Sequence, residues 1–364
     1  MTTTAPRPTH TTTLRGRMLK LAEWITTPLV PSDYLDVIDP LRSVEALRGR
    51  IVEIHPETRD AVTLVVKPGR GWHAHVPGQY VRVGVDVDGV RQWRAYSLTS
   101  ATDRPDGSIT ISVKAIPGGT VSNYLVRRAA VGTVIQLDRA TGGFILDRPV
   151  PAKVLFVTAG SGITPVMGML RNMPHSVASD VVVVHSAPTG ADVIFGGELR
   201  MLAARGRIRL VEIHTDIDGM LAVDALGDVV PDLAERHTWA CGPTGLLDDL
   251  EKYWAAMGFA ERLHTERFRP TVIATGEGGT VSFTTTGACV DNDGTQPLLD
   301  TGEAAGVLMP SGCRMGICFG CVAPLRRGAV RDLRTGEITT AAEGDGVVIQ
   351  TCISAAAGPC DIEL

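Results

Sequence analysis

The pattern of hydrophobic and polar positions divides the chain of 364 residues into regions of different character. Residues 50–148 hold short, partly alternating runs of β-branched residues, separated by turn dipeptides such as Asp88-Gly89. Short strands at this spacing predict a small antiparallel β-barrel. From Lys153 onward, continuous apolar runs such as residues 181–184 alternate with segments of helical periodicity. That alternation predicts an open parallel sheet, whose ligand crevice lies at the carboxyl ends of the strands.

The C-terminal part of the chain predicts a separate α+β unit. Residues 270–279 contain a proline and several glycines and are typical of a linker. Beyond them the pattern predicts an early strand, a helix around residues 298–305, a cysteine-rich loop and two late strands. The chain is therefore expected to be multidomain, with five segments: an N-terminal extension that is disordered and then helical (1–48), a β-barrel (49–150), an α/β domain with a parallel sheet (151–269), a linker (270–279) and a small α+β domain (280–364).

A helical pattern begins at Leu14 in the N-terminal extension. Its apolar residues share one face, the basic residues Arg15, Arg17 and Lys20 lie on another, and prolines end it. This segment either packs on the next domain or rests on a membrane surface as a basic amphipathic helix. Residues 14–27 are therefore a candidate for peripheral membrane contact.

Composition narrows the classes of function. A hydrophobic content of 44% and a charged content of 21% are typical of a globular protein. The formal net charge of −5 argues against a nucleic-acid partner, because phosphate contacts require a basic surface. The N-terminus lacks the apolar stretch of a secretory signal, and no run of residues has the length of a membrane span. These features favour a cytoplasmic protein, either free or bound peripherally at the inner face of the membrane.

Four cysteines near the C-terminus carry the strongest chemical signal. Cys313, Cys318 and Cys321 have the spacing C-x₄-C-x₂-C, and Cys352 follows in an apolar run. This spacing is typical of a plant-type [2Fe–2S] centre, in which four thiolates hold two irons. A structural zinc site would need a second cysteine or histidine pair, and a disulfide framework would need a secreted chain. The pattern therefore predicts a [2Fe–2S] cluster in the last domain.

Two motifs in the barrel region suit a flavin. The first is Arg94-Ala95-Tyr96-Ser97, which offers a cation for phosphate, an aromatic face and a hydroxyl donor. The second is Gly118-Gly119, followed by Ser122, where glycines admit a pyrophosphate and a helix beginning near Val121 points its positive end at it. Each motif alone also fits an ordinary strand end or turn. Their order and spacing favour a flavin site.

Two further motifs suit a nicotinamide dinucleotide. Residues 158–165, Thr-Ala-Gly-Ser-Gly-Ile-Thr-Pro, lie between a buried strand and a helix, so their glycines admit a phosphate backbone. Cys241-Gly242-Pro243 ends a later strand, and its cysteine either packs as a small residue or flanks the nicotinamide. After the second strand of this domain, Ser186 stands where an NAD site carries an acidic residue. Hydroxyls there, with Arg200 or Arg205 nearby, favour NADPH.

In this order, the motifs resemble the ferredoxin–NADP⁺ reductase superfamily with a plant-type [2Fe–2S] ferredoxin domain fused at the C-terminus. The resemblance covers roughly residues 50–364 and implies an FAD-binding β-barrel, an NAD(P)-binding α/β domain and a ferredoxin domain of β-grasp type. In that family the arginine meets a flavin phosphate, and Glu266 and Phe268 match residues close to the flavin ring. The implied catalytic residues are Ser97, Cys241 and Glu266; the implied cofactor-binding residues are Arg94, Ala95, Tyr96, Ser97, Gly118, Gly119, Ser122, Thr158, Gly160, Gly162, Thr164, Gly242, Pro243 and Phe268.

Within this superfamily the chain is most similar to actinobacterial oxidoreductases that pass electrons from NADPH to membrane acyl-CoA desaturases. Residues 24–29 and the loop 312–318 carry that likeness. It implies electron transfer from NAD(P)H through FAD and a [2Fe–2S] cluster to a diiron desaturase. The open alternatives are an oxygenase, an alkane hydroxylase or a cytochrome P450 as acceptor, FMN in place of FAD, NADH in place of NADPH, and a redox sensor whose cluster signals rather than conducts. Pro188 stands where many NADPH-using relatives carry arginine.

Overall fold

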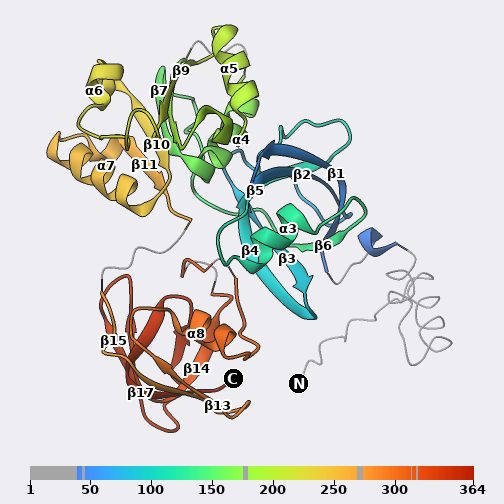
Figure 1. Cartoon of the computed structure of the whole chain (residues 1–364), viewed down its shortest axis with the longest axis vertical. Coiled ribbons are helices and arrows are strands. Elements are labelled where there is room, and N and C mark those ends of the chain that lie inside the picture. Colours follow the sequence, from blue (N-terminus) through green and yellow to red (C-terminus); the bar gives the residue numbers. More distant parts are fainter. Residues whose placement is uncertain (1–38, 43–45, 175–178, 269–273, 313, 317–318) are drawn as a thin grey trace, which may run out of the picture.

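The computed structural model describes residues 39–42, 46–174, 179–268, 274–312, 314–316 and 319–364. The expected N-terminal helix (14–27) and two of the expected cluster ligands, Cys313 and Cys318, lie outside the described residues. The described strands form three separate sheets, which Figure 1 shows as three units. Within this part of the chain, none of the helices combines the length and the hydropathy needed to cross a bilayer.

The first unit is an antiparallel β-barrel. Asp88 and Gly89 both have positive φ values, 52° and 83°, as a two-residue type I′ hairpin turn requires. A bridge between Leu98, directly after β4, and Ile111 of β5 joins the two edge strands, so the sheet closes on itself. The sheet order is β4-β3-β6-β1-β2-β5. The elements are η1 (Pro40–Arg42), β1 (Arg48–Thr58), β2 (Ala61–Pro68), β3 (Tyr80–Val87), β4 (Val90–Ser97), β5 (Ile109–Lys114), α3 (Thr120–Arg127) and β6 (Val134–Leu137).

The second unit is a parallel sheet in the order β11-β10-β7-β8-β9, with helices on both faces. Met167 of α4 and Leu199 of α5 belong to the core on one face, and Leu247 of α7 belongs to the core on the other. Because both faces are covered, β7 and β8 are continuous apolar runs. The elements are β7 (Lys153–Ala159), η2 (Gly160–Gly162), α4 (Ile163–Asn172), β8 (Asp180–Ala187), η3 (Gly190–Asp192), α5 (Gly196–Ala204), β9 (Arg209–His214), α6 (Leu226–Val229), η4 (Leu233–Glu235), β10 (His237–Cys241), α7 (Thr244–Ala256), η5 (Ala260–Arg262) and β11 (Leu263–Glu266).

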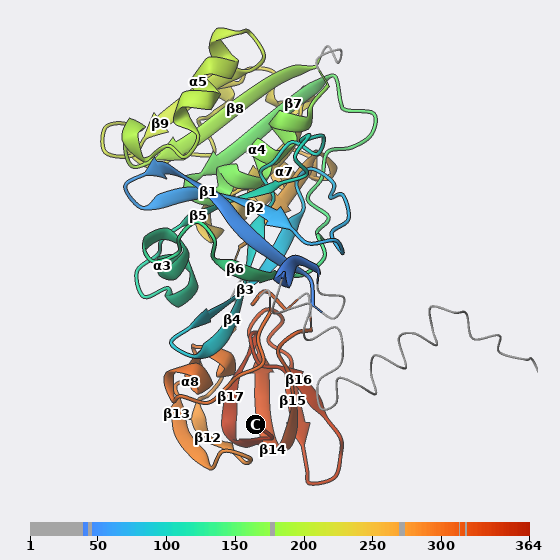
Figure 2. The ribbon, with the colours of Figure 1, turned by 90° about the vertical axis from the view of Figure 1, so that its right-hand side faces the viewer.

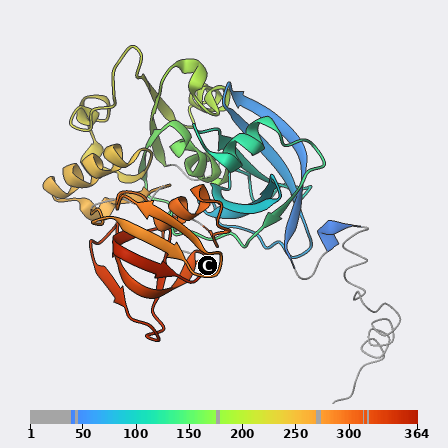
Figure 3. The same ribbon diagram turned by 60° about the horizontal axis from the view of Figure 1, so that its bottom comes forward.

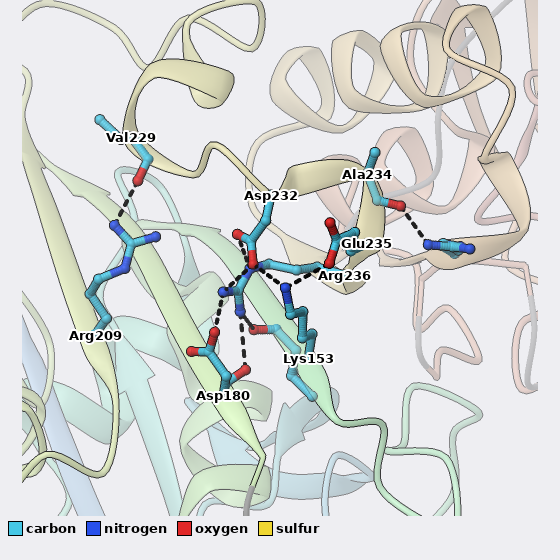
Figure 4. A network of polar contacts seen from close by, with 10 residues as sticks. Lys153, Asp180, Arg209, Val229, Asp232, Ala234, Glu235 and Arg236 are labelled. Carbon is cyan, nitrogen blue, oxygen red and sulfur yellow. Dashed lines mark hydrogen bonds and ion pairs between the residues drawn. The ribbon is translucent and has the colours of Figure 1, made fainter.

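A network of ion pairs and hydrogen bonds joins the amino ends of the strands in this sheet (Figure 4). Arg236, directly before β10, is 2% exposed, and its guanidinium contacts the carboxylates of Asp180 and Asp232. Its Nη1 also donates to the carbonyl of Val154, 3.2 Å away. Lys153 Nζ reaches Asp232 at 2.9 Å from the start of β7. The buried cation is therefore fully surrounded by acceptors, as burial of a charge demands.

The third unit is a mixed sheet with one helix. Its strands follow the order β13-β12-β17-β14-β15, and β16 pairs with β14. β12 and β17 are parallel, and the other pairs are antiparallel. The elements are β12 (Gly279–Phe283), β13 (Ala288–Asn292), α8 (Leu298–Ala304), β14 (Val322–Asp332), β15 (Ile338–Ala341), β16 (Val348–Gln350) and β17 (Ser354–Ile362). Leu298, Phe283 and Ile349 belong to its own core, so this unit has the α+β character that the sequence predicts.

The third unit lies against the barrel. Figure 2 shows it below the barrel, with α8 next to the β3–β4 hairpin. In Figure 3, where the third unit comes forward, α8 remains beside the barrel strands. Met315, between two predicted cluster ligands in sequence, is buried in a small apolar cluster with Tyr80 and Ala95 of the barrel. Met315 of the cysteine loop therefore packs directly against the barrel.

Candidate functional site

One cavity of about 760 Å³ lies where the three units meet. Residues from the barrel, from the segment that ends the second unit, and from the third unit all line it. Such a meeting point of domains is a common place for a cofactor site. Of the residues expected from the sequence, the cavity wall includes Arg94, Ala95, Ser97, Gly118, Gly119, Glu266, Phe268 and Cys352.

Strand β4 supplies the charged part of the barrel wall. Burial and the nearby guanidinium of Arg314 lower the pKa of Arg94 to about 10, and its Nη1 donates to the carbonyl of Trp93 at 2.8 Å. Ser97 at the end of β4 is buried beside it. Tyr96 instead packs against the core of the barrel, where burial raises the pKa of its hydroxyl. The partly buried cation of Arg94 is suited to an anionic ligand in the cavity.

A glycine turn forms the next part of the wall. Gly118 has a φ of 70°, and no atom lies within 4 Å of the position that a Cβ would take there. Gly119 is the N-cap of α3 and gives no side-chain cap to the backbone N–H groups of the first turn. Ser122 lies behind this turn, with its hydroxyl 3.4 Å from the backbone nitrogen of Ile116. Open space at an uncapped helix N-terminus is the arrangement that accepts phosphate.

Glu266 and Phe268 bring the second unit into the cavity. Glu266 ends β11 and lies in register with Cys241 at the end of β10. Burial raises the pKa of Glu266 to about 7. Burial and the neighbouring Glu266 raise the pKa of the Cys241 thiol well above its ordinary value. A carboxyl with this pKa exchanges its proton near neutral pH, as groups at reacting sites commonly do.

The two expected nucleotide turns lie side by side at the carboxyl ends of β7 and β10. A Cβ on Gly162 would lie 1.9 Å from the carbonyl oxygen of Cys241, so only glycine permits this approach. Gly242 is 3.3 Å from Ala159 by the same measure, and Pro243 is the N-cap of α7. The structure therefore brings these two motifs together, next to the cavity rather than in its lining.

Two threonine hydroxyls of the first of these turns, residues 158–165, make contacts within the protein. Thr158 is fully buried, and its hydroxyl lies 2.8 Å from Nδ1 of His185 on β8. Thr164 Oγ1 donates to the carbonyl of Ser161 at 3.0 Å. Gly160 has a φ of 54°, a conformation that favours glycine. Thr158 and Thr164 are therefore bonded within the protein, and Gly160 forms the open part of the turn.

The third unit closes the cavity with residues that the sequence did not indicate. Arg314 Nη1 binds the carboxylate of Asp300 at 2.6 Å, and the same guanidinium binds Glu303. Asp300 and Glu303 lie three residues apart on α8 and so share one face. Met315 follows Arg314 in the wall. The position of Arg314 inside the C-x₄-C loop was the one sequence signal that could have identified this contact.

Two described cysteines of the last unit, Cys321 and Cys352, lie close together, and Cys352 lines the cavity. Cys321 and Cys352 are 1% and 2% exposed, and their Sγ atoms lie 3.1 Å apart. A disulfide would require a separation of about 2.05 Å. Two buried sulfurs that converge without such a bond fit ligands of a common metal centre. The barrel wall likewise fits a flavin, because a partly buried cation, open space at Gly118 and an uncapped helix end border one cavity.

Comparisons with known proteins agree with this arrangement. The chain matches the oxidoreductase FAD-binding domain over residues 52–145 and the oxidoreductase NAD-binding domain over residues 156–252. It is 47% identical to an NADPH oxidoreductase of Mycobacterium tuberculosis (strain H37Rv), over 95% of this chain and 91% of that protein. It is 30% identical to the glycine betaine monooxygenase reductase subunit of Pseudomonas aeruginosa (strain UCBPP-PA14), over 76% of this chain and 84% of that protein.

The structure of phthalate dioxygenase reductase, described as transferring electrons from pyridine nucleotides to [2Fe–2S], superposes with a TM-score of 0.61. That match covers 87% of this chain and 97% of the other at 21% identity, and therefore shows a shared fold. The expected FAD-binding antiparallel domain and NAD-binding parallel-sheet domain are thus confirmed. The chain belongs to the family of oxidoreductases with FAD- and NAD-binding domains of the ferredoxin–NADP⁺ reductase type.

Proposed function

We propose that this protein is an NAD(P)H-dependent oxidoreductase that uses FAD and a [2Fe–2S] cluster to deliver single electrons to an acceptor protein. The observation that carries the proposal is the shared cavity, because Arg94 of the barrel and Cys352 of the third unit line the same space. Electron transfer requires donor and acceptor groups to be held close together. A cavity between a flavin-type site and two cluster-type thiols meets that requirement.

Bound FAD would supply the conversion of a two-electron hydride into single electrons. In this proposal Arg94 and the amino end of α3 hold its phosphates, with Ala95, Tyr96 and Ser122 supporting them. Phe268 borders the ring. FAD is favoured over FMN because the glycine turn provides room for a second phosphate. Release of the flavin and its identification by chromatography would decide between the two.

Ser97, Cys241 and Glu266 are assigned to the place where nicotinamide and flavin ring meet. Glu266 can hold or release a proton at its carboxyl near neutral pH, because burial raises its pKa to about 7. Cys241 stays a neutral thiol, since burial raises its pKa. Its role is therefore to shape the nicotinamide pocket, beside the turn formed by Thr158, Gly160, Gly162 and Thr164 and next to Gly242 and Pro243.

The last domain, assigned to residues 280–364, is proposed to be a ferredoxin-type domain of β-grasp fold. Cys313, Cys318, Cys321 and Cys352 would hold the cluster through four thiolates. The 3.1 Å approach of the two described sulfurs supports this assignment. The other expected boundaries, 49–150 for the flavin domain and 151–269 for the nucleotide domain, belong to the same proposal.

NADPH is the favoured coenzyme. Arg200 lies on α5 and reaches the turn that follows β8, where its Nη2 is 3.1 Å from the carbonyl oxygen of Gly190 and 3.0 Å from a carboxylate oxygen of Glu212. Ser186 is a buried hydroxyl residue near the carboxyl end of β8. A guanidinium held at this edge can meet a 2′-phosphate, and the 47% identical relative is named for NADPH.

The favoured acceptor is a diiron acyl-CoA desaturase in a membrane, with residues 14–27 as a peripheral membrane contact. The resemblance of the sequence to actinobacterial oxidoreductases that serve such desaturases supports this choice. A specific observation supports the runner-up, delivery to an oxygenase, since a 30% identical relative is the reductase subunit of a monooxygenase. Reconstitution of the purified protein with a desaturase and, separately, with an oxygenase would distinguish them. Desaturation without oxygenase turnover supports the first assignment, and the reverse result refutes it.

Reduction of cytochrome c tests the electron-transfer function itself. We expect NADPH-driven reduction by the wild type and at least about a hundredfold loss in Cys352→Ser, because the cluster is the exit for single electrons. Reduction of the flavin by NADPH should persist in this variant, which also shows that the variant folds. A redox sensor predicts slow cytochrome c reduction by both proteins, and that outcome would refute the proposal.

A further inference from the structure

Three potential metal ligands converge on one face of the second unit, at its amino end. His237 begins β10, His264 lies on the neighbouring β11, and Asp147 lies in the segment that connects the barrel to β7. Asp147 Oδ2 is 3.8 Å from Nδ1 of His237 and 3.9 Å from Nε2 of His264. The three donor atoms all lie within 4.8 Å of one another.

The strand register places the imidazoles of His237 and His264 on the same face of the sheet. Trp239 follows His237 by two residues on β10, so both side chains point to the same side. Trp239 also pairs with His264 across the β10–β11 ladder, and the two rings stack at 4.6 Å with an interplanar angle of 15°. The fully buried Trp239 therefore fixes the orientation of the His264 ring.

The same tryptophan anchors the segment that carries the carboxylate. Trp239 Nε1 donates to the carbonyl of Ile145 at 3.0 Å, two residues before Asp147. Leu146 packs against the core cluster that contains Trp239. The position of Asp147 is therefore set by the same fully buried ring that sets His264. The three donors come from separate parts of the sequence but share one rigid support.

The two ring nitrogens that face Asp147 are buried atoms that could each bind a metal ion. In the described part of the structure, Nδ1 of His237 and Nε2 of His264 are inaccessible to solvent and have no hydrogen-bond partner. A buried polar atom without a partner is costly and calls for an explanation. The side chain of Asp147 is 49% exposed, so an ion can enter and water can complete its coordination.

From this arrangement we propose that Asp147, His237 and His264 bind a divalent transition-metal ion of the zinc class. Imidazole nitrogen and carboxylate oxygen coordinate zinc at about 2.0–2.2 Å, which places tetrahedral ligand atoms roughly 3.3 Å apart. The two distances from Asp147 exceed that value by about half an ångström, and the two ring nitrogens lie within 4.8 Å of each other, so side-chain movements complete the site. The ion would clamp the connecting segment 138–152 onto β10 and β11.

The site lies at the opposite end of the sheet from the nucleotide turns. His237 is the first residue of β10, whereas Cys241 is the last. The ion therefore has no direct contact with the proposed hydride-transfer region. Its expected effect is on the stability of the barrel–sheet junction, because an ion that binds the folded state alone stabilises that state.

Zinc titration of the holoprotein by calorimetry tests this proposal. The experiment uses a Cys289→Ser background, since the exposed thiol of Cys289 would also bind zinc. We expect one zinc per chain and at least tenfold weaker binding in both His264→Gln and Asp147→Asn. His55→Gln is the matched control, because His55 also faces a carboxylate, that of Glu53 at 2.9 Å, but has no third ligand among the residues that the structure describes.

Thermal unfolding gives a second readout that does not depend on activity. Zinc should raise the melting temperature of the background protein and of His55→Gln, and should leave that of Asp147→Asn unchanged. Flavin content and far-ultraviolet circular dichroism show that each variant is folded. If zinc binding is absent, or weakens less than tenfold in either ligand variant, the three residues form only a histidine–carboxylate ion pair and the proposal is wrong.

Discussion

Arg236 at the amino ends of the parallel sheet and Glu266 at the carboxyl ends have opposite electrostatic environments. At the amino ends, the buried Arg236 is surrounded by Asp180, Asp232 and backbone carbonyls. At the carboxyl ends, Glu266 and Cys241 lie in register, and burial raises the pKa of both. Neutralised charge suits an end that has to hold the strands together. Desolvated titratable groups are common at reacting sites, which supports the hydride-transfer site proposed at this end.

Breaking the network at the amino ends should have the largest effect on stability. Arg236→Met leaves the carboxylates of Asp180 and Asp232 without their buried partner, so we expect the free energy of unfolding to fall by about 3–5 kcal/mol. Arg209→Met is the matched control, because Arg209 is exposed and makes one bond to the carbonyl of Val229. Urea denaturation followed by circular dichroism measures both. Equal losses of unfolding free energy in the two variants would show that the buried network of Arg236 does not stabilise the sheet more than the exposed bond of Arg209.

Glu266 should make stability depend on pH in the opposite sense to a paired carboxylate. Because burial raises its pKa from 4.5 to about 7, the folded state keeps a proton that the unfolded chain releases. The contribution of Glu266 to stability is therefore greatest below about pH 4.5 and falls by at most about 3 kcal/mol as the pH rises from there through 7. Glu266→Gln should remove this part of the pH dependence. An unchanged pH profile in the variant would show that Glu266 is not a buried carboxyl with a raised pKa.

A smaller effect is expected from Arg200, which we expect to influence the choice between NADPH and NADH. Arg200→Gln removes the cation that reaches the turn after β8, so we expect kcat/KM for NADPH to fall about tenfold while that for NADH changes less than about twofold. Arg205→Gln, at the end of α5, is the control and should leave both values unchanged. Equal losses with the two coenzymes would place Arg200 outside the 2′-phosphate site.

The sequence predicted those parts of the fold whose signal is local. The Asp88-Gly89 turn and the continuous apolar strands β7 and β8 are specified by neighbouring residues, and the structure has them at the expected places. Strand β11 was not predicted, because Leu-His-Thr-Glu is short, mostly polar and only partly buried. Its position depends on pairing with β10, which is a long-range contact.

The candidate site likewise combines motifs that lie within short stretches of sequence with contacts between residues far apart in the chain. The glycine turn at Gly118-Gly119 and the cysteine spacing are local patterns, so they could be found in the sequence. The pairing of Arg314 with Asp300 and Glu303, and the meeting of Asp147 with His264, join residues that are separated along the chain and appear only after folding. Sequence spacing carries no direct trace of such contacts.

Anaerobic titration with NADPH, followed by visible absorbance and electron paramagnetic resonance, tests the central claim most directly. If the shared cavity couples a flavin to a cluster, the wild type should take up about three electrons per chain, two at the flavin and one at the cluster. Cys352→Ser should take up about two and lack the cluster signal. Uptake of two electrons by the wild type, or of three by Cys352→Ser, would contradict this account.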